Sequence, residues 1–188
     1  MGSVVIHQRG LHTAAHPVVD ELSVATGETC HLAVLSGTDA VYVYKIDGAS
    51  SIIMSSRVGG RAPSHCTSIG KVLVAWARPG LVEQVMEQGL RPYTQATITS
   101  PEGFAAELDK VRAQGCAFDL EEYEQGLCCV AAPVRDYSGS VIAALGLAGP
   151  RSRVTKRRLN ELTTSVIGAA EAISRKLGYV PAAVVGVG

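Results

Sequence analysis

The stretch "GCAFDLEEYEQGLCCVAAPVRDYSGSVIAALGLAGP", residues 115–150, decides the fold class of this chain. It holds three apolar segments, at 116–119, 127–135 and 140–148, which are separated by an acidic loop and by the turn "DYSG". A short polar turn of this kind joins two antiparallel neighbours in a sheet. The stretch therefore predicts three consecutive antiparallel strands.

The region before this stretch shows the same strand pattern. Apolar segments at 29–36, 40–46 and 51–56 are separated only by "GTD" and "DGAS", which predicts a second antiparallel meander. Helical periodicity covers five further segments: 10–26, 67–77, 80–88, 101–114 and 155–177. The chain is therefore predicted to be α+β, with a six-stranded antiparallel sheet, helices packed on it, and a long C-terminal helix.

Length and composition indicate one globular domain. Lys plus Arg equals Asp plus Glu, at 17 each in 188 residues, so no overall positive charge is available to hold nucleic acid. No apolar run is long enough to span a membrane, and no signal peptide opens the sequence. We expect a cytoplasmic domain at 10–178, a disordered or tag-like segment at 1–9, and a flexible tail at 179–188.

The sequence gives little indication of a metal site or of disulfide bonds. The five cysteines lack C-x-x-C spacing, which argues against a structural zinc site or a disulfide framework. His12, His16 and Asp20 share one predicted helix face with metal-like spacing, but a solvated face explains them better. The basic cluster from Arg151 to Arg158 likewise fits a solvated turn better than a phosphate contact. We expect no metal and no cofactor.

A Gly-Lys pair in "HCTSIGKVLVAW", residues 65–76, raises the question of a nucleotide site. The phosphate-binding loop G-x-x-x-x-G-K-[ST] requires a glycine where His65 stands and a hydroxyl where Val72 stands. Because both requirements fail, we interpret Lys71 as a solvated side chain and Gly70 as a residue that allows close helix packing.

Three stretches of the chain resemble the signature motifs of the effector-binding domain of IclR-type transcriptional regulators. They are "GGRAPSHCTSIGKVLVAW", "GCAFDLEEYEQGLCCVAAPVRDYSG" and "SVIAALGLAGPRSRVT", in the family's order. The resemblance runs from about residue 10 to 178 and implies a GAF-like fold with a curved sheet, a small-molecule effector, and self-association as a dimer or tetramer. The family also implies DNA binding through an N-terminal winged helix-turn-helix domain, which we do not find in this chain.

The resemblance places the effector pocket between the sheet and the segment 58–70. Carried over by motif, the ligand-binding positions are Met54, Ser68, Ile69, Asp119, Cys129, Gly146 and Ala148. The family commonly has small hydroxyl residues where this chain has Gly146 and Ala148. We therefore expect either that backbone amides near Ser68 bind the ligand's carboxylate, or that the pocket is enlarged for a bulkier ligand such as an aromatic acid.

Several of these positions also have ordinary structural explanations. Asp119 is the first of four carboxylates in six residues, a pattern that fits a solvated loop. If Asp119 instead faces a partly desolvated pocket, its pKa should rise, and the pocket should bind an acidic ligand only when Asp119 is protonated. Met54 suits either a core or a pocket wall. Cys128 and Cys129 point to opposite faces of a strand, and a buried thiol explains either of them.

Taken together, these features predict a ligand-sensing domain and not an enzyme. We expect micromolar binding of a small organic or aromatic acid, which alters DNA binding by a separate helix-turn-helix domain, and no membrane partner. The alternative is a thiol-dependent enzyme of GAF fold, with Cys129 as nucleophile, His65 as base and Asp119 as orienting group. A third hypothesis, compatible with the first, is a self-assembly domain.

Overall fold

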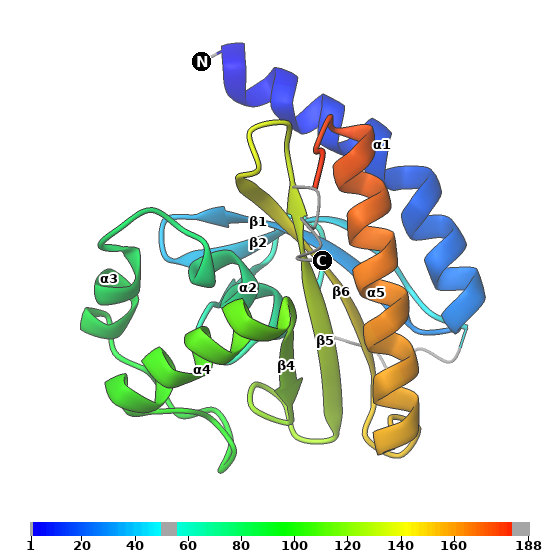
Figure 1. Ribbon diagram of the computed structural model, residues 1–188. Coiled ribbons are helices and arrows are strands. Elements are labelled where there is room, and N and C mark those ends of the chain that lie inside the picture. Colours follow the sequence, from blue (N-terminus) through cyan, green and yellow to red (C-terminus); the bar gives the residue numbers. More distant parts are fainter. Residues whose placement is uncertain (1, 50–55, 182–188) are drawn as a thin grey trace, which may run out of the picture.

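The chain folds around one six-stranded sheet. The computed structural model describes residues 2–49 and 56–181, with side chains from residue 10 onward (Figure 1). The strands are β1 Thr29–Ser36, β2 Asp39–Ile46, β3 Arg61–Pro63, β4 Ala117–Leu120, β5 Leu127–Arg135 and β6 Val141–Pro150. Their order is β3-β2-β1-β6-β5-β4, and all neighbours are antiparallel. Because β1 pairs with β6, the two meanders form a single sheet.

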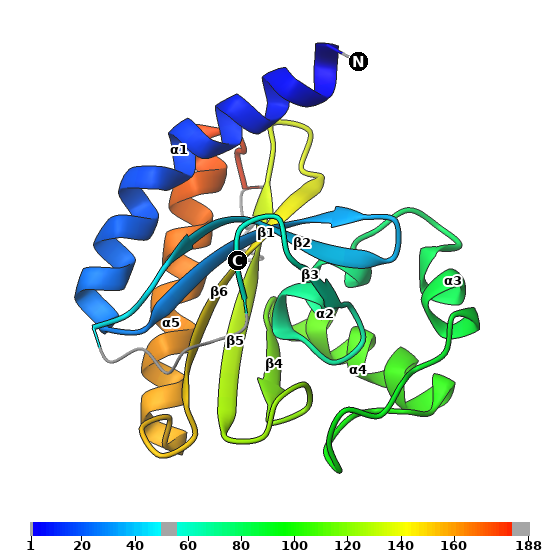
Figure 2. The ribbon, with the colours of Figure 1, turned by 180° about the vertical axis from the view of Figure 1, so that it is seen from behind.

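Helices cover both faces of this sheet. They are α1 Gly2–Thr26, α2 Ser68–Ala75, α3 Leu81–Glu87, α4 Pro101–Gln114 and α5 Lys156–Lys176. The long helices α1 and α5 lie side by side over one face, and the three short helices pack over the other (Figures 1 and 2). The molecule therefore has three layers, with a separate hydrophobic core on each side of the sheet.

The alternation of side chains along the strands explains these two cores. In β6, Leu145 packs into the core under α1 and α5, whereas its neighbour Ala144 packs into the core under α2. The face toward α2 also carries Ala33 from β1 and Ala131 from β5. Such small side chains let α2 lie close to the sheet, and its residues are buried throughout.

Capping residues set the ends of the helices. The side-chain oxygens of Thr67, Ser100 and Thr155 each accept a hydrogen bond from the first turn of α2, α4 and α5, respectively. Helix α4 ends at Gly115, whose φ of 74° lies in the left-handed region that favours glycine. The predicted limits of α4 and β5 agree with the structure.

The predicted α+β class, the antiparallel six-stranded sheet and the long C-terminal helix are confirmed. The third strand differs: residues 51–55 of the expected segment lie outside the described residues, Ser56 is in no strand, and β3 lies at Arg61–Pro63. Helix α1 begins at Gly2, well before the predicted start at residue 10. Within the part of the chain that the structure describes, no helix combines the length and apolar character needed to span a membrane.

Candidate functional site

A cavity of about 350 Å³ lies between the start of α2 and the sheet. Its walls come from all six strands, from the start of α2, from the segment before β3, and from the loop that joins β4 to β5. The residues that line it are His31, Tyr42, Ser56, Arg57, Gly60, Arg61, Ala62, Thr67, Ser68, Ile69, Asp119, Tyr123, Glu124, Leu127, Cys129, Gly146 and Leu147. Elements far apart in the sequence therefore meet around one partly open cavity.

Most of the ligand-binding positions inferred from the family motifs lie together at this cavity. Ser68, Ile69, Asp119, Cys129 and Gly146 line it. Of the other two, Ala148 is buried opposite Cys129 in the β5–β6 ladder and is not among the residues that line the cavity, and Met54 lies outside the described residues.

His31, Tyr42 and Tyr123 also line the cavity, although the sequence reasoning did not single them out. The available signal was the alternation of β1 and β2, because it places His31 and Tyr42 on defined faces of their strands. That alternation alone does not show which face borders a cavity.

The sequence suggested that the missing side chain of Gly146 enlarges the cavity, but the structure shows otherwise. A Cβ built on Gly146 would lie 2.9 Å from Ile69 Cγ2. The methyl group of Ile69 therefore occupies the space next to Gly146, and the glycine lets the start of α2 approach β6. Ala148 adds no space either, because it does not line the cavity.

Asp119 is the buried carboxyl group of the site, with an exposed fraction of 2%. Its Oδ1 accepts hydrogen bonds from the amides of Glu122, at 2.8 Å, and Tyr123, at 3.3 Å. Burial raises the pKa of Asp119 to about 7, and the charge of Glu122 also raises it, against lowering by the Glu122 amide and by Lys71. The direction agrees with the expectation from sequence. Because both bonds end on Oδ1, the second oxygen is left for a ligand.

His31 and Tyr42 add uncharged polar groups. Burial, followed by the charge of Lys45, lowers the pKa of His31 to about 4, so its ring is neutral near pH 7. Its Nε2 lies 2.9 Å from Ser56 Oγ, and its ring centroid lies 5.1 Å from that of Tyr42. Burial also raises the pKa of the Tyr42 hydroxyl. Both side chains can therefore exchange hydrogen bonds with a ligand without carrying charge at neutral pH.

The start of α2 supplies backbone donors. Thr67 Oγ1 accepts from the amide of Gly70 at 3.2 Å and donates to the Pro63 carbonyl at 2.7 Å. The cap thus uses the Gly70 amide, and the expected anion contact falls to the amides of Ser68 and Ile69, which both line the cavity.

The arrangement does not suit thiol catalysis. Burial raises the pKa of the Cys129 thiol well above its ordinary value, whereas a nucleophilic cysteine needs a lowered pKa. His65 Nε2 lies 2.9 Å from the Arg91 carbonyl and is not among the residues that line the cavity. Cys128 lies in the opposite core, under α1 and α5, so the two adjacent thiols face opposite sides as expected.

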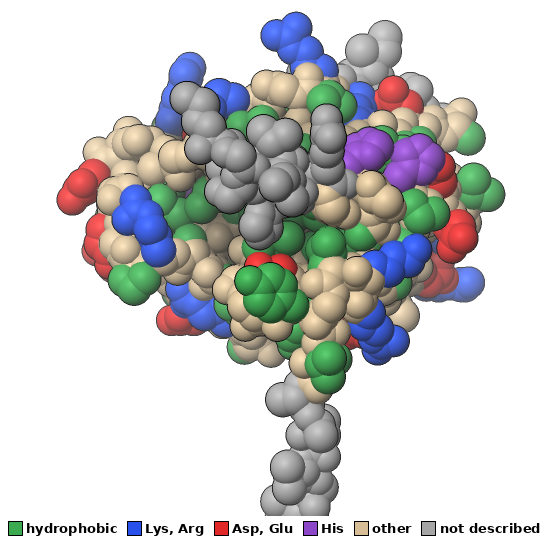
Figure 3. All heavy atoms as spheres, turned by 90° about the horizontal axis from the view of Figure 1, so that it is seen from above, with side chains coloured by type: hydrophobic (Ala, Val, Ile, Leu, Met, Phe, Trp, Pro, Cys, Tyr) green, Lys and Arg blue, Asp and Glu red, His purple; other side chains and the backbone are tan. Residues whose placement is uncertain are grey.

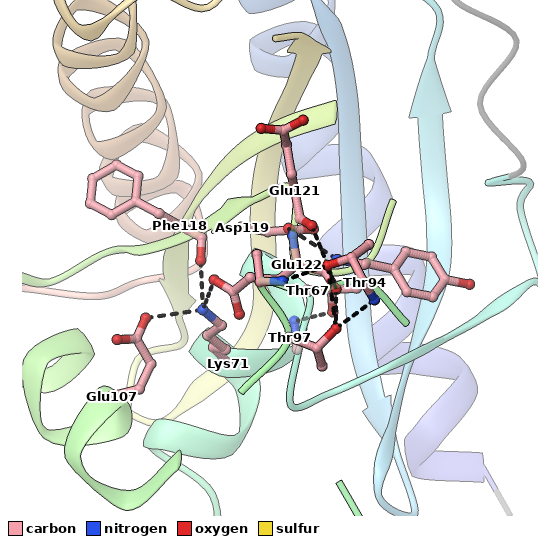
Figure 4. Close-up of polar contacts among 12 residues, drawn as sticks. Thr67, Lys71, Thr94, Thr97, Glu107, Phe118, Asp119, Glu121 and Glu122 are labelled. Atoms are coloured by element: carbon pink, nitrogen blue, oxygen red, sulfur yellow. Dashed lines mark hydrogen bonds and ion pairs between the residues drawn. The ribbon is translucent and has the colours of Figure 1, made fainter. Parts of the chain in front are cut away.

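Lys71 is not solvated, and the interpretation from sequence is wrong at this position. Its side chain has an exposed fraction of 0%. Its Nζ donates to Glu107 Oε1 at 3.0 Å, to Glu122 Oε1 at 2.6 Å and to the Phe118 carbonyl at 2.7 Å (Figure 4). Gly70 does allow close packing, because it lies against the backbone of Ser64.

The other candidate sites form contacts within the chain. His16 Nδ1 lies 3.4 Å from Asp20 Oδ2, and no group of three or more His, Cys, Asp or Glu side chains suited to a metal occurs among the described residues. In the basic cluster, Arg153 pairs with Glu28 at 2.8 Å, and Arg158 pairs with Glu161 at 3.1 Å. Charges of both signs are interspersed on the face seen in Figure 3, without a continuous basic surface.

Comparisons with known proteins show which proteins this chain resembles. The family model described as "Bacterial transcriptional regulator IclR C-terminal" matches residues 3–175. The chain is 41% identical over 180 residues to the HTH-type transcriptional regulator XynR of Escherichia coli (strain K12), which covers 95% of this chain and 69% of that protein.

Solved structures show the same fold. The C-terminal domain of the E. coli regulator KdgR matches with a TM-score of 0.81 at 40% identity, over 90% of this chain and 99% of that chain. An IclR homolog from Microbacterium hydrocarbonoxydans, in complex with 4-hydroxybenzoate, matches with a TM-score of 0.84 at 26% identity, over 90% of this chain and 69% of that chain.

Proposed function

This chain belongs to the IclR family of bacterial transcriptional regulators, as their C-terminal effector-binding domain, and we propose that it senses a small organic acid, aromatic acids included. The observation that carries the proposal is the cavity of about 350 Å³ beside α2, with a buried carboxyl group and neutral hydrogen-bonding side chains in its walls. The ligand positions inferred from the motifs, Met54 and Ala148 included, remain part of the proposal.

The size of the cavity suits a ligand of about ten non-hydrogen atoms. Small-molecule pockets enclose roughly 300–1,000 Å³, and this cavity lies near the lower end of that range. Micromolar affinity requires about −8 kcal/mol, which ten atoms supply within the limit of about −1.5 kcal/mol per atom. The complex of an IclR homolog with 4-hydroxybenzoate supports a ligand of this class.

The polar groups favour one orientation. A ligand carboxylate fits the amides of Ser68 and Ile69, at the positive end of the α2 dipole. A hydroxyl group fits the free oxygen of Asp119, which accepts a hydrogen bond when ionised and donates one when protonated. Ile69 and Leu127 provide apolar contact in the cavity wall.

Ligand binding regulates transcription only if the ligand prefers one conformation of the whole regulator. A difference of about 1–3 kcal/mol in affinity between two conformations is typical of such coupling. We infer that this domain transmits that difference to a helix-turn-helix domain of the regulator, since the similar proteins XynR and KdgR are named HTH-type transcriptional regulators.

Filling the cavity tests the proposal. Wild-type protein should bind at least one member of a panel of organic and aromatic acids, 4-hydroxybenzoate among them, with micromolar affinity by calorimetry and without product formation by NMR. Cys129→Leu adds volume toward the cavity and should weaken binding at least about tenfold, whereas the nearly isosteric Cys129→Ser should stay within about threefold. Equal affinity of Cys129→Leu and wild type, or turnover of a panel member, would contradict the proposal.

We also expect the chain to self-associate as a dimer or tetramer. The basis for this expectation is the resemblance to the family, which implies self-association. Sedimentation velocity over a range of concentrations should show a species heavier than the 19.6 kDa monomer. A monomer at the highest concentration would refute this expectation.

A further inference from the structure

A buried lysine connects two walls of the cavity. Lys71 lies in α2, two residues after Ile69, which lines the cavity. An ammonium group has three N–H donors, and the three acceptors of Lys71 come from α4, from β4 and from the loop between β4 and β5 (Figure 4). A buried cation needs such full pairing, because an unpaired charge in the interior is strongly unfavourable.

Glu122 is the acceptor that leads to the cavity. Its Oε1 accepts from Lys71, its amide donates to Asp119 Oδ1, and its carbonyl accepts from Thr97 Oγ1 at 2.6 Å and Thr94 Oγ1 at 3.2 Å. Its Oε2 is buried and has no hydrogen-bond partner among the described residues. Among the described residues, Lys71 is therefore the cation that offsets the burial of this carboxylate side chain.

The loop around Glu122 does not adopt a relaxed backbone conformation. Glu121, the preceding residue, has a φ of 62°, the left-handed region, and it is the one non-glycine residue with positive φ among those described. Such a conformation persists when surrounding contacts hold it. Tyr123 and Glu124, the next two residues, line the cavity.

We propose that Lys71 is a positioning residue for ligand binding: through Glu122 it fixes the Asp119 carboxyl group and Tyr123 relative to the start of α2. The expected effect on ligand affinity rests on the proposed function, whereas the expected effect on the position of the loop does not. The second acid partner, Glu107, lies on α4 and does not line the cavity, although it pairs with the same ammonium group. The two glutamates therefore form a matched pair, one connected to the cavity through its backbone amide and one that is not among the residues lining it.

The first experiment needs no ligand. Glu122→Ala and Glu107→Ala each remove one carboxylate from Lys71, and amide hydrogen exchange is measured on each folded variant. Glu122→Ala should speed exchange of the residue 122 and 123 amides at least about tenfold, because these amides donate to Asp119, while Val130 in β5 keeps its protection. Glu107→Ala should change all three less than about threefold. Equal effects of the two variants on the loop would overturn the positioning role.

The second experiment measures affinity for the tightest-binding acid of the panel. Glu122→Ala should weaken binding at least about tenfold at pH 7, and Glu107→Ala less than about threefold. In the Glu122→Ala background, Lys71→Met should add less than about threefold, since its effect is transmitted through Glu122. A full additional loss in the double variant would show that Lys71 acts by another route. If no acid binds wild type, the proposed function fails, and hydrogen exchange still decides the positioning of the loop.

Discussion

Replacing Asp119 with asparagine is expected to stabilise the protein progressively as the pH rises from 4 to 8. The pKa of Asp119 is about 7 in the folded protein, against an ordinary value of 3.8. Between these values the folded protein holds a proton that the unfolded chain has lost, so wild-type stability declines as the pH rises through this window. Asparagine has no proton to lose, and its oxygen can still accept from the amides of Glu122 and Tyr123.

The size of this effect follows from the pKa difference. Each pKa unit corresponds to about 1.4 kcal/mol, so the unfolding free energy of Asp119→Asn relative to wild type should increase by about 4 kcal/mol between pH 4 and pH 8. Urea unfolding at several pH values measures this difference. Asp109→Asn, at an exposed helix position, is the control and should stay within about 0.5 kcal/mol of wild type throughout. Parallel curves for wild type and Asp119→Asn would contradict the buried carboxyl group.

His31 should show the opposite pH dependence in an overlapping window. Its pKa is about 4 in the folded protein, against 6.5 ordinarily, so the unfolded chain binds a proton that the folded protein excludes as the pH falls. His31→Gln should therefore gain about 3 kcal/mol relative to wild type between pH 7 and pH 4. In wild type the two contributions oppose each other between pH 4 and 6.5, and only the single variants separate them.

The sequence could predict the fold because local signals decide it. Turn residues and alternating apolar segments locate the strands, and capping residues together with Gly115 locate the helix ends. Strand β3 could not be predicted in this way, because the three residues "RAP" are too few to show alternation. The strand is defined by its pairing with β2. An isolated segment of that length has no stable structure without its neighbour.

The residues of the candidate site could be predicted only at positions that the family motifs contain. The family motifs indicate Ser68, Asp119 and Cys129, but the burial of Lys71 depends on tertiary contacts. Its partners Glu107 and Glu122 lie 36 and 51 residues further along the chain, so helical periodicity around position 71 cannot reveal them. A lysine is assigned to the solvent by default, since lysines are almost never fully buried unless they are paired.

Gly70→Ala is expected to destabilise the protein by about 3 kcal/mol, because the new methyl group has no space. A Cβ at this position would overlap Ser64 Cα and would lie 2.8 Å from the Ser64 carbonyl oxygen and 2.7 Å from Thr67 Oγ1. The overlapping atoms belong mainly to the backbone, and hydrogen bonds hold that segment: Ser64 Oγ donates to the Thr38 carbonyl at 2.6 Å, and Thr67 Oγ1 donates to that of Pro63 at 2.7 Å.

Gly168→Ala provides the matched control for this substitution. Gly168 lies at an exposed position inside α5, and a Cβ there would meet nothing within 4 Å. Since alanine favours the helix over glycine, this variant should gain about 0.5–1 kcal/mol, opposite in sign to Gly70→Ala, with both measured by urea unfolding. A neutral Gly70→Ala would mean that α2 can move away from Ser64. In that case Ser68 and Ile69 would not be held at a fixed position beside the cavity. The proposed contact of their amides with a ligand carboxylate, and the proposed positioning of Asp119 by Lys71 relative to α2, would then both lose their basis.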